Sequence, residues 1–300
     1  MTGRADRRTL LTGLGAFALA GTAAACSQPR RPDEPPPPPL DLTDLEARHG
    51  GRIGVSALDT AFSRSVSWRG QERFAYCSTF KLFLAAATLE RVAKGEERLD
   101  RAIRVTRADI IPHAPVTGRA VGRSLTVETL CRAMVEVSDN PAANIMIREM
   151  GGLAAWRAWW PTLGDNSTTI SRLEPDLNSA EANDPRDTAL PDQTVGNLRE
   201  VLLGDRLTPD HRQLLEGWMT ASPTGPARIK AAGPLGWAVA HKTGTGGNGA
   251  TNDIGLLRPP SGQPVLVAAY FTEAPRATIE QREAVLAEGV RRALRSLGHG

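Results

Sequence analysis

The chain has 300 residues, of which 41% are hydrophobic and 23% are charged, an ordinary composition for a soluble globular protein of one large or two small domains. Its net charge is +3, and the first 40 residues hold five arginines against three acidic residues, so residues 41–300 are nearly neutral. No basic domain is present, and we expect no nucleic-acid partner.

The N-terminus has the pattern of an export signal. Residues 1–26 combine a charged start with an apolar run ending at Ala25, which is too short and too rich in glycine and threonine to span a membrane. The pair Arg7-Arg8 is similar to a twin-arginine signal, and TAAAC is similar to a degenerate lipobox ending at Cys26. We expect export, followed either by lipidation of Cys26 or by plain cleavage near Ala25.

A proline-rich linker follows at residues 27–40, and the folded domain is expected at 41–300. Proline runs cannot pack a core and form stiff polyproline spacers. TDLE at 43–46 has the spacing of a capping box and predicts a short helix. Segments 51–60 and 63–68 alternate as half-buried strands do.

Helices are predicted from Ser78 to about Trp218, where alanine- and leucine-rich runs dominate. These runs cover 78–93, 127–137, 141–150 and 194–203. Strand character returns in the last third of the chain, at 237–244, 252–258 and 264–272. An amphipathic helix closes the chain, opened by Thr278 with Gln281 in the capping-box position.

This order of elements predicts a two-lobed α/β protein. An antiparallel sheet built from the N- and C-terminal segments would be flanked by helices, with an all-helical lobe inserted between them. The α/β lobe is expected at about 41–76 and 219–300, and the helical lobe at about 77–218. A cleft between lobes is a common ligand site.

Ser78 and Lys81 stand three residues apart in an apolar run, and almost one helical turn would place them on one face. The chain uses only four lysines, although it is rich in arginine. A buried lysine can lose its proton and arginine cannot, and a serine nucleophile needs a base within reach. The alternative is an incidental serine at a helix start.

Three further clusters carry polar groups. SDN at 138–140 precedes a proline that fits a helix start. It is therefore either a helix-capping turn or a set of polar side chains that takes part in catalysis or binding. KTG at 242–244 ends a strand, where a lone match is only a tight turn. The loop 170–188 has no period, and one helical turn in it would point Glu174 and Asn178 at a single water.

The order of these motifs identifies a family. Each three-residue pattern has a chance rate of roughly 0.05–0.07 per chain of this size. Ser78-x-x-Lys81 followed by SDN and KTG resembles the penicillin-recognising serine enzymes, and the added Glu174-x-x-Leu-Asn178 is similar to class A β-lactamases. The resemblance covers about 41–300. It implies hydrolysis of the β-lactam amide of penicillins and cephalosporins through a serine acyl-enzyme, and hence β-lactam resistance.

The resemblance also implies catalytic roles. Ser78 would attack the β-lactam carbonyl, and Ser138 would relay a proton to the departing nitrogen. Glu174, held with Asn178, would position and deprotonate the hydrolytic water. Lys81 and Glu174 both remain candidates for the base that activates the serine.

The implied binding groups surround these residues. Amides of Ser78 and Thr245 would form an oxyanion hole, and Arg228 would help the KTG motif to hold the substrate carboxylate. His113 stands where relatives often place tyrosine or tryptophan, and His241 replaces a usually acidic residue. The expected substrate-binding set is Asn140, Lys242, Thr243, Gly244, Thr245, Arg228 and His113.

The remaining expectations concern cofactors, disulfides, alternative functions and the location of the protein. The five histidines lack ligand spacing, so no metal or cofactor is expected. Ala85 and Gly246 stand where relatives place the partners of Cys131 and Cys77, so we expect no disulfide. The alternatives are a D,D-peptidase or transpeptidase, and a non-hydrolytic β-lactam-binding sensor lipoprotein. We expect a monomer in an extracytoplasmic or periplasmic location, either secreted or attached to the membrane through Cys26.

Overall fold

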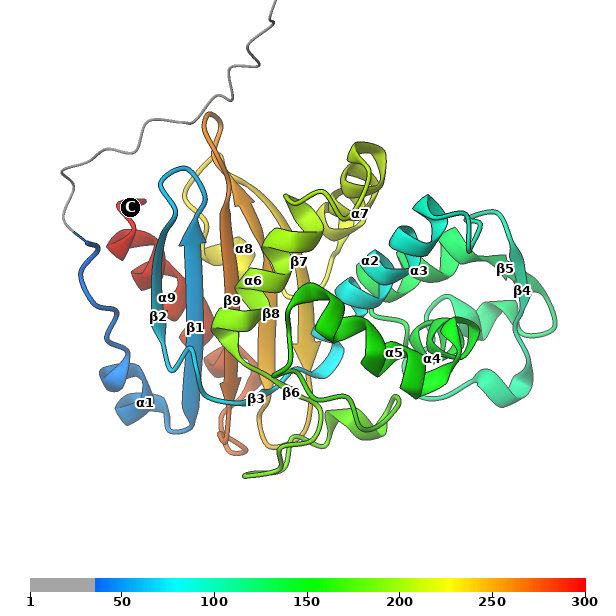
Figure 1. Ribbon diagram of the computed structural model, residues 1–300. Coiled ribbons are helices and arrows are strands. Elements are labelled where there is room, and N and C mark those ends of the chain that lie inside the picture. Colours follow the sequence, from blue (N-terminus) through cyan, green and yellow to red (C-terminus); the bar gives the residue numbers. More distant parts are fainter. Residues whose placement is uncertain (1–35) are drawn as a thin grey trace, which may run out of the picture. The chain divides into compact units, whose positions relative to one another are not determined.

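A five-stranded antiparallel sheet forms the centre of the α/β lobe (Figure 1). The computed structural model describes residues 36–300, so the predicted signal at 1–26 and most of the linker at 27–40 lie outside the described residues. The strand order is β2-β1-β9-β8-β7, and β1 joins the N-terminal hairpin to the C-terminal strands by pairing with β9. The strands are β1 (Arg52–Asp59), β2 (Arg64–Trp68), β7 (Ala238–Thr245), β8 (Thr251–Arg258) and β9 (Val265–Thr272).

The five predicted strands are confirmed, and no bound shifts by more than one residue. β9 is buried along its whole length, because helices cover both faces of the sheet at this central position. Its sequence VLVAAYFT is accordingly apolar throughout and does not alternate. Figure 1 shows α1 and α9 on one side of the sheet, with α6 and the helical lobe on the other.

Nine α-helices are present within residues 36–300. The α-helices are α1 (Thr43–His49), α2 (Phe80–Ala93), α3 (Val127–Glu136), α4 (Asn140–Met150), α5 (Gly152–Trp159), α6 (Pro191–Leu202), α7 (Pro209–Ala221), α8 (Ile229–Ala232) and α9 (Ile279–Ser296). The predicted capping box of Thr278 and Gln281 is present at the start of α9. No helix within 36–300 is both long enough and apolar enough to cross a membrane.

The inserted lobe packs α2, α3, α4 and α5 around one apolar core. It also contains a two-stranded sheet that the sequence did not predict, β4 (Ala102–Arg104) with β5 (Ser124–Thr126). A second short pair, β3 (Phe74–Ala75) with β6 (Thr188–Ala189), closes the base of the loop 170–188. Strands of two or three residues carry too little pattern to be read from sequence.

The capping box predicted at residues 43–46 is wrong, although the helix itself is present. Leu42 occupies the N-cap position and supplies no side-chain cap. Glu46 turns away from the helix start and binds Arg69 through two hydrogen bonds of 2.8 Å, while also accepting the backbone N–H of Ile53. A bidentate bond to a guanidinium is stronger than a bond to one neutral amide.

Candidate active site

Ser78 lies in a single 3₁₀ turn, Cys77–Thr79, between β3 and the first residue of α2. Cys77 adopts a left-handed backbone with φ of 47°, which is unusual for a residue other than glycine. Ser138 and His113, which line the same cavity as Ser78, have φ values of 59° and 66°. Such conformations cost free energy and cluster at functional sites, where packing holds them in place.

The Lys81 ammonium is fully buried and connects three of the sequence motifs. Its Nζ donates to Ser78 Oγ at 3.0 Å and to the Ser138 backbone oxygen at 2.9 Å, and it also bonds Asn140 Oδ1. Glu174 Oε1 lies 2.9 Å from Lys81 Nζ and accepts from Ser78 Oγ at 3.3 Å. Serine, lysine and carboxylate therefore form one contact set.

Burial lowers the pKa of Lys81 below its ordinary value, and the nearby Glu174 carboxylate opposes this shift only in part. A lowered pKa makes it easier for Lys81 to give up its proton, and the neutral amine is the form that can accept a proton from a serine hydroxyl.

The SDN turn combines structural and chemical functions. Asp139 caps α4 by accepting the N–H of Ala142 at 2.9 Å, and it also accepts the Thr117 hydroxyl at 2.7 Å. Ser138 and Asn140 face Lys81 instead. The capping interpretation thus holds for the middle residue, while its neighbours belong to the polar cluster.

Lys242 enters the same cluster from β7 and is also fully buried. Its Nζ donates to Ser138 Oγ at 3.0 Å and to the Thr243 backbone oxygen at 2.8 Å. Burial, together with the positive charge of Lys81, lowers the pKa of Lys242 well below its ordinary value. Ser138 Oγ thus has a lysine on each side, since Lys81 Nζ is 3.4 Å away.

Hydrogen bonds hold both the side chain and the backbone of Glu174 in place. Asn178 donates its side-chain amide to Glu174 Oε2, and the Asn144 side chain bonds both the N–H and the C=O of Glu174, at 3.0 and 2.8 Å. An ion pair of 2.6 Å between Arg172 and Asp187 holds the base of the same loop. Asn144 was missed by the sequence analysis, although it lies four residues after Asn140 on the same helical face.

A cavity of about 310 Å³ opens beside this cluster. It is lined by Ser78, His113, Ser138, Asn140, Asn178, Thr224, Gly225, Arg228, Thr243, Gly244 and Thr245. Lys81, Glu174 and Lys242 lie buried behind this lining. Thr224, whose hydroxyl lies 2.8 Å from the Thr243 hydroxyl, belongs to no motif and could not be predicted from the sequence.

Two lining residues extend the site beyond the motifs. Arg228 is buried and donates from Nη2 to Thr245 Oγ1 at 3.0 Å, while its Nε pairs with Glu283 at 2.9 Å. The exposed His113 bonds the Val137 backbone oxygen through Nε2 at 2.9 Å, which fixes the orientation of its ring.

Cys77 and Cys131 are both free and buried. Burial raises the pKa of each thiol to about 12, so neither forms a thiolate readily.

Comparisons with known proteins agree with this geometry. The model of the "Beta-lactamase enzyme family" matches residues 40–291. The chain is 41% identical to Beta-lactamase ROB-1 of Haemophilus influenzae over 77% of this chain and 75% of that protein. It is 40% identical to the Carbapenem-hydrolyzing beta-lactamase KPC of Klebsiella oxytoca, over 85% and 87% of the two chains.

Solved structures give the same result. An ancestral class A β-lactamase matches with a TM-score of 0.82 and 47% identity, over 85% of this chain and 98% of that chain. The putative class A β-lactamase PenP of Rhodopseudomonas palustris matches with a TM-score of 0.81 and 40% identity, over 84% and 96%. The chain therefore belongs to the β-lactamase enzyme family and is a class A serine β-lactamase, a hydrolase of β-lactams that confers resistance to them.

Proposed function

We propose that the chain opens the β-lactam amide by forming an acyl-enzyme on Ser78 and then hydrolyses that ester with a water activated by Glu174. The observation that carries the proposal is the buried contact set in which Ser78 Oγ lies 3.0 Å from Lys81 Nζ and 3.3 Å from Glu174 Oε1. A serine within hydrogen-bond reach of two proton acceptors is the arrangement that nucleophilic catalysis requires.

In the acylation step Ser78 Oγ bonds to the β-lactam carbonyl carbon and the ring C–N bond breaks. The serine proton passes to Lys81 or Glu174, which are the two groups in reach. Ser138 returns a proton to the departing nitrogen, supported by its position between Lys81 and Lys242. The backbone amides of Ser78 and Thr245 would hold the developing oxyanion, and one such donor typically contributes about 10²–10³ in rate.

In the deacylation step Glu174 removes a proton from water, which attacks the ester carbonyl and frees Ser78. The side-chain bond from Asn178 and the two bonds from Asn144 support this role, because they fix the carboxylate and its backbone. General-base positioning of this kind contributes about 10²–10⁴ in rate.

Substrate binding would use the cations and hydroxyls of the β7 edge. Lys242, Thr243 and Thr245 would hold the substrate carboxylate, with Arg228 reaching it beside Thr245. Asn140, Gly244 and His113 line the rest of the cavity and would contact the acyl side chain and the β-lactam core. We propose penicillins and cephalosporins as substrates, and carbapenem turnover is worth assaying because one relative carries that activity in its name.

The location of the enzyme is also a proposal. The twin-arginine-like and lipobox-like patterns support export, with Cys26 either lipidated or removed with the signal. The folded domain at 41–300 would then act outside the cytoplasm as a monomer.

The direct test mixes the purified protein with a large excess of a chromogenic cephalosporin and then measures intact mass. Many turnovers per molecule with little residual adduct are expected. One equivalent consumed, with a stable adduct on Ser78, would contradict the deacylation step and favour a peptidase or a sensor.

A further inference from the structure

Behind the cavity wall lies a buried acid–base pair to which the reaction steps above give no part. His241 on β7 and Asp253 on β8 are both fully buried. The imidazole Nδ1 lies 2.9 and 2.8 Å from the two carboxylate oxygens of Asp253, so an N–H at this position is shared between them. A carboxylate held by both oxygens has little freedom to rotate.

The Asp253 carboxylate is also bonded to the segment that carries Arg228. Its Oδ2 accepts the backbone N–H of Ile229 at 3.1 Å. Ile229 opens the short helix α8 and directly follows Arg228 in sequence. From this anchored position the guanidinium reaches the Gly244 backbone oxygen at 3.0 Å and Thr245 Oγ1 at 3.0 Å.

His241 lies on the face of β7 that also carries Thr245, the residue that Arg228 contacts. Residues two and four apart on a strand share a face, so His241, Thr243 and Thr245 lie on one face of β7 and Lys242 on the other. Gly255 pairs with His241 across the strands, and a Cβ there would lie 2.2 Å from the Ala240 backbone oxygen. Glycine is therefore required beside the histidine.

Histidine at this position has an energetic cost. Its Nε2 is buried and has no hydrogen-bond partner within residues 36–300. A buried polar atom without a partner is destabilising, and an apolar side chain of similar size would avoid that cost. The Nδ1–H donor to Asp253 is the property of histidine that an apolar residue would lack.

We propose that His241 is a positioning residue, which orients Asp253 so that Asp253 holds the start of α8 and thereby the Arg228 guanidinium at the cavity wall. The inference rests on the proposed role of Arg228 in binding the substrate carboxylate. His241 touches no substrate in this arrangement and acts only through Asp253 and Arg228.

The test compares His241→Leu, which removes the donor at similar size, with His241→Asn, which keeps an amide donor near the Nδ1 position. For a penicillin we expect His241→Leu to raise KM about tenfold and to change kcat by less than about threefold. His241→Asn should restore KM to within about threefold of the parent. Thermal unfolding of both variants shows whether either has lost its fold.

Two controls separate positioning from general damage. His299→Ala removes another histidine–aspartate pair, the 2.9 Å contact with Asp59, and should leave KM unchanged because that pair has no bond to α8. In an Arg228→Ala background, His241→Leu should raise KM by less than about twofold further, because the effect passes through Arg228.

The outcomes are distinct. An equal rise in KM from His241→Leu with and without Arg228 would overturn the inference, as would a loss of thermal stability with no change in KM. Normal KM in Arg228→Ala alone would instead contradict the proposed role of Arg228. Absence of turnover in the parent enzyme would contradict the proposed function itself.

Discussion

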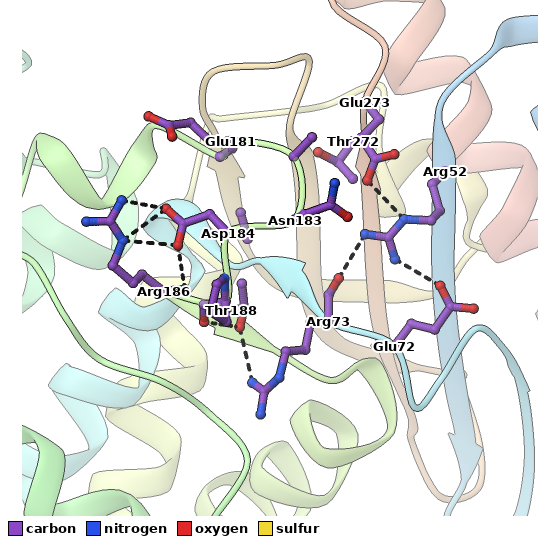
Figure 2. Close-up of a pocket in the computed structure, with 14 residues that line it drawn as sticks. Arg52, Glu72, Arg73, Glu181, Asn183, Asp184, Arg186, Thr188, Thr272 and Glu273 are labelled. Carbon is purple, nitrogen blue, oxygen red and sulfur yellow. Dashed lines mark hydrogen bonds and ion pairs between the residues drawn. The ribbon is translucent and has the colours of Figure 1, made fainter.

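The loop 170–188 contributes residues to two cavities whose charges are arranged differently. The catalytic cavity encloses about 310 Å³ and receives Asn178 from this loop. A second cavity, of about 540 Å³, is lined by residues 180–186 together with residues from β1, β3 and β9 (Figure 2). By volume alone the second cavity would be the better candidate for a ligand site.

The second cavity is lined by charges that are largely paired with one another. Its arginines are Arg52, Arg73 and Arg186, and its acidic residues are Glu72, Glu181, Asp184 and Glu273. Figure 2 shows Arg52 between Glu72 and Glu273, at 3.0 and 3.1 Å, and Arg186 against Asp184 at 2.8 Å. Surface pairs of this kind contribute little free energy and leave little charge for a ligand.

The catalytic cavity has the opposite arrangement. Lys81 and Lys242 are fully buried behind it, and of these two only Lys81 has a carboxylate within ion-pair distance in the described residues. Burying an amine without a paired carboxylate is costly, and such a group is retained where a ligand or a reaction uses it. Two buried lysine amines, of which Lys242 has no paired carboxylate within residues 36–300, therefore distinguish the catalytic cavity, and its volume does not.

The largest expected effect follows removal of the nucleophile. Ser78→Ala should lower kcat by about 10⁴–10⁶, because loss of a serine nucleophile removes the covalent route. Intact mass should show no adduct after incubation with a penicillin. Ser65→Ala, at an exposed position of β2, is the control and should keep full activity. An adduct on the Ser78→Ala protein would place the nucleophile elsewhere.

The next largest effect is expected from Glu174, with Glu181 on the same loop as the control. Glu174→Gln should acylate at a rate near that of the parent if Lys81 is the acylation base, and then stall, with kcat lowered about 10²–10⁴. Mass spectrometry should trap a stable adduct on Ser78. Glu181→Gln, in the lining of the second cavity, should change kcat by less than about twofold. Slow adduct formation by Glu174→Gln would assign the acylation step to Glu174 as well.

How much of this site the sequence predicts depends on how far apart in sequence the contacting residues lie. Ser78 with Lys81, and Glu174 with Asn178, are three and four residues apart, so one turn of local structure brings each pair together. The long strands were predictable for the same reason, since alternation and apolar runs are local patterns. The joining of the clusters into one site came from the family resemblance and not from spacing.

What the sequence did not predict depends on contacts between distant segments. Asn144 contacts Glu174 across 30 residues, and Glu46 leaves its helix cap for Arg69, 23 residues away. His241 was noted only as an unusual residue, because its partner Asp253 is defined by the register of β7 on β8. Neither strand pairing nor packing of this kind can be read from composition or period.

The third prediction is that one substitution at the catalytic cavity lowers activity while it raises stability. Lys242→Met should lower kcat/KM at least about tenfold but raise the free energy of unfolding at pH 7 by roughly 1–3 kcal/mol. The reason is that it removes a buried amine with no carboxylate at ion-pair distance among residues 36–300.

The gain from Lys242→Met should depend on pH. Lys242 has its ordinary pKa of 10.5 in the unfolded chain and a lower pKa in the folded protein. At pH values between the folded pKa and 10.5, the unfolded chain binds more protons than the folded one, so the stability of the parent rises with pH. The stability gap to the variant should therefore narrow as pH rises towards 10.5. Urea unfolding at several pH values measures it, and a gap that widened with pH would contradict the lowered pKa.

The smallest effect is expected in the second cavity, from Arg52→Met, which keeps an apolar stem of similar length. The Arg52 side chain is 26% exposed and its partners Glu72 and Glu273 are 44% and 39% exposed, so solvent screens both ion pairs. We expect a loss of about 0.5–1 kcal/mol in urea unfolding, and kcat/KM within about twofold of the parent. Arg186→Met, which removes the pair with Asp184 on the loop itself, is the matched variant and should also leave kcat/KM within about twofold of the parent. A tenfold fall in kcat/KM in either variant, with stability little changed, would mean that the second cavity controls the loop carrying Glu174. The contrast between paired and unpaired charge would then no longer separate the two cavities.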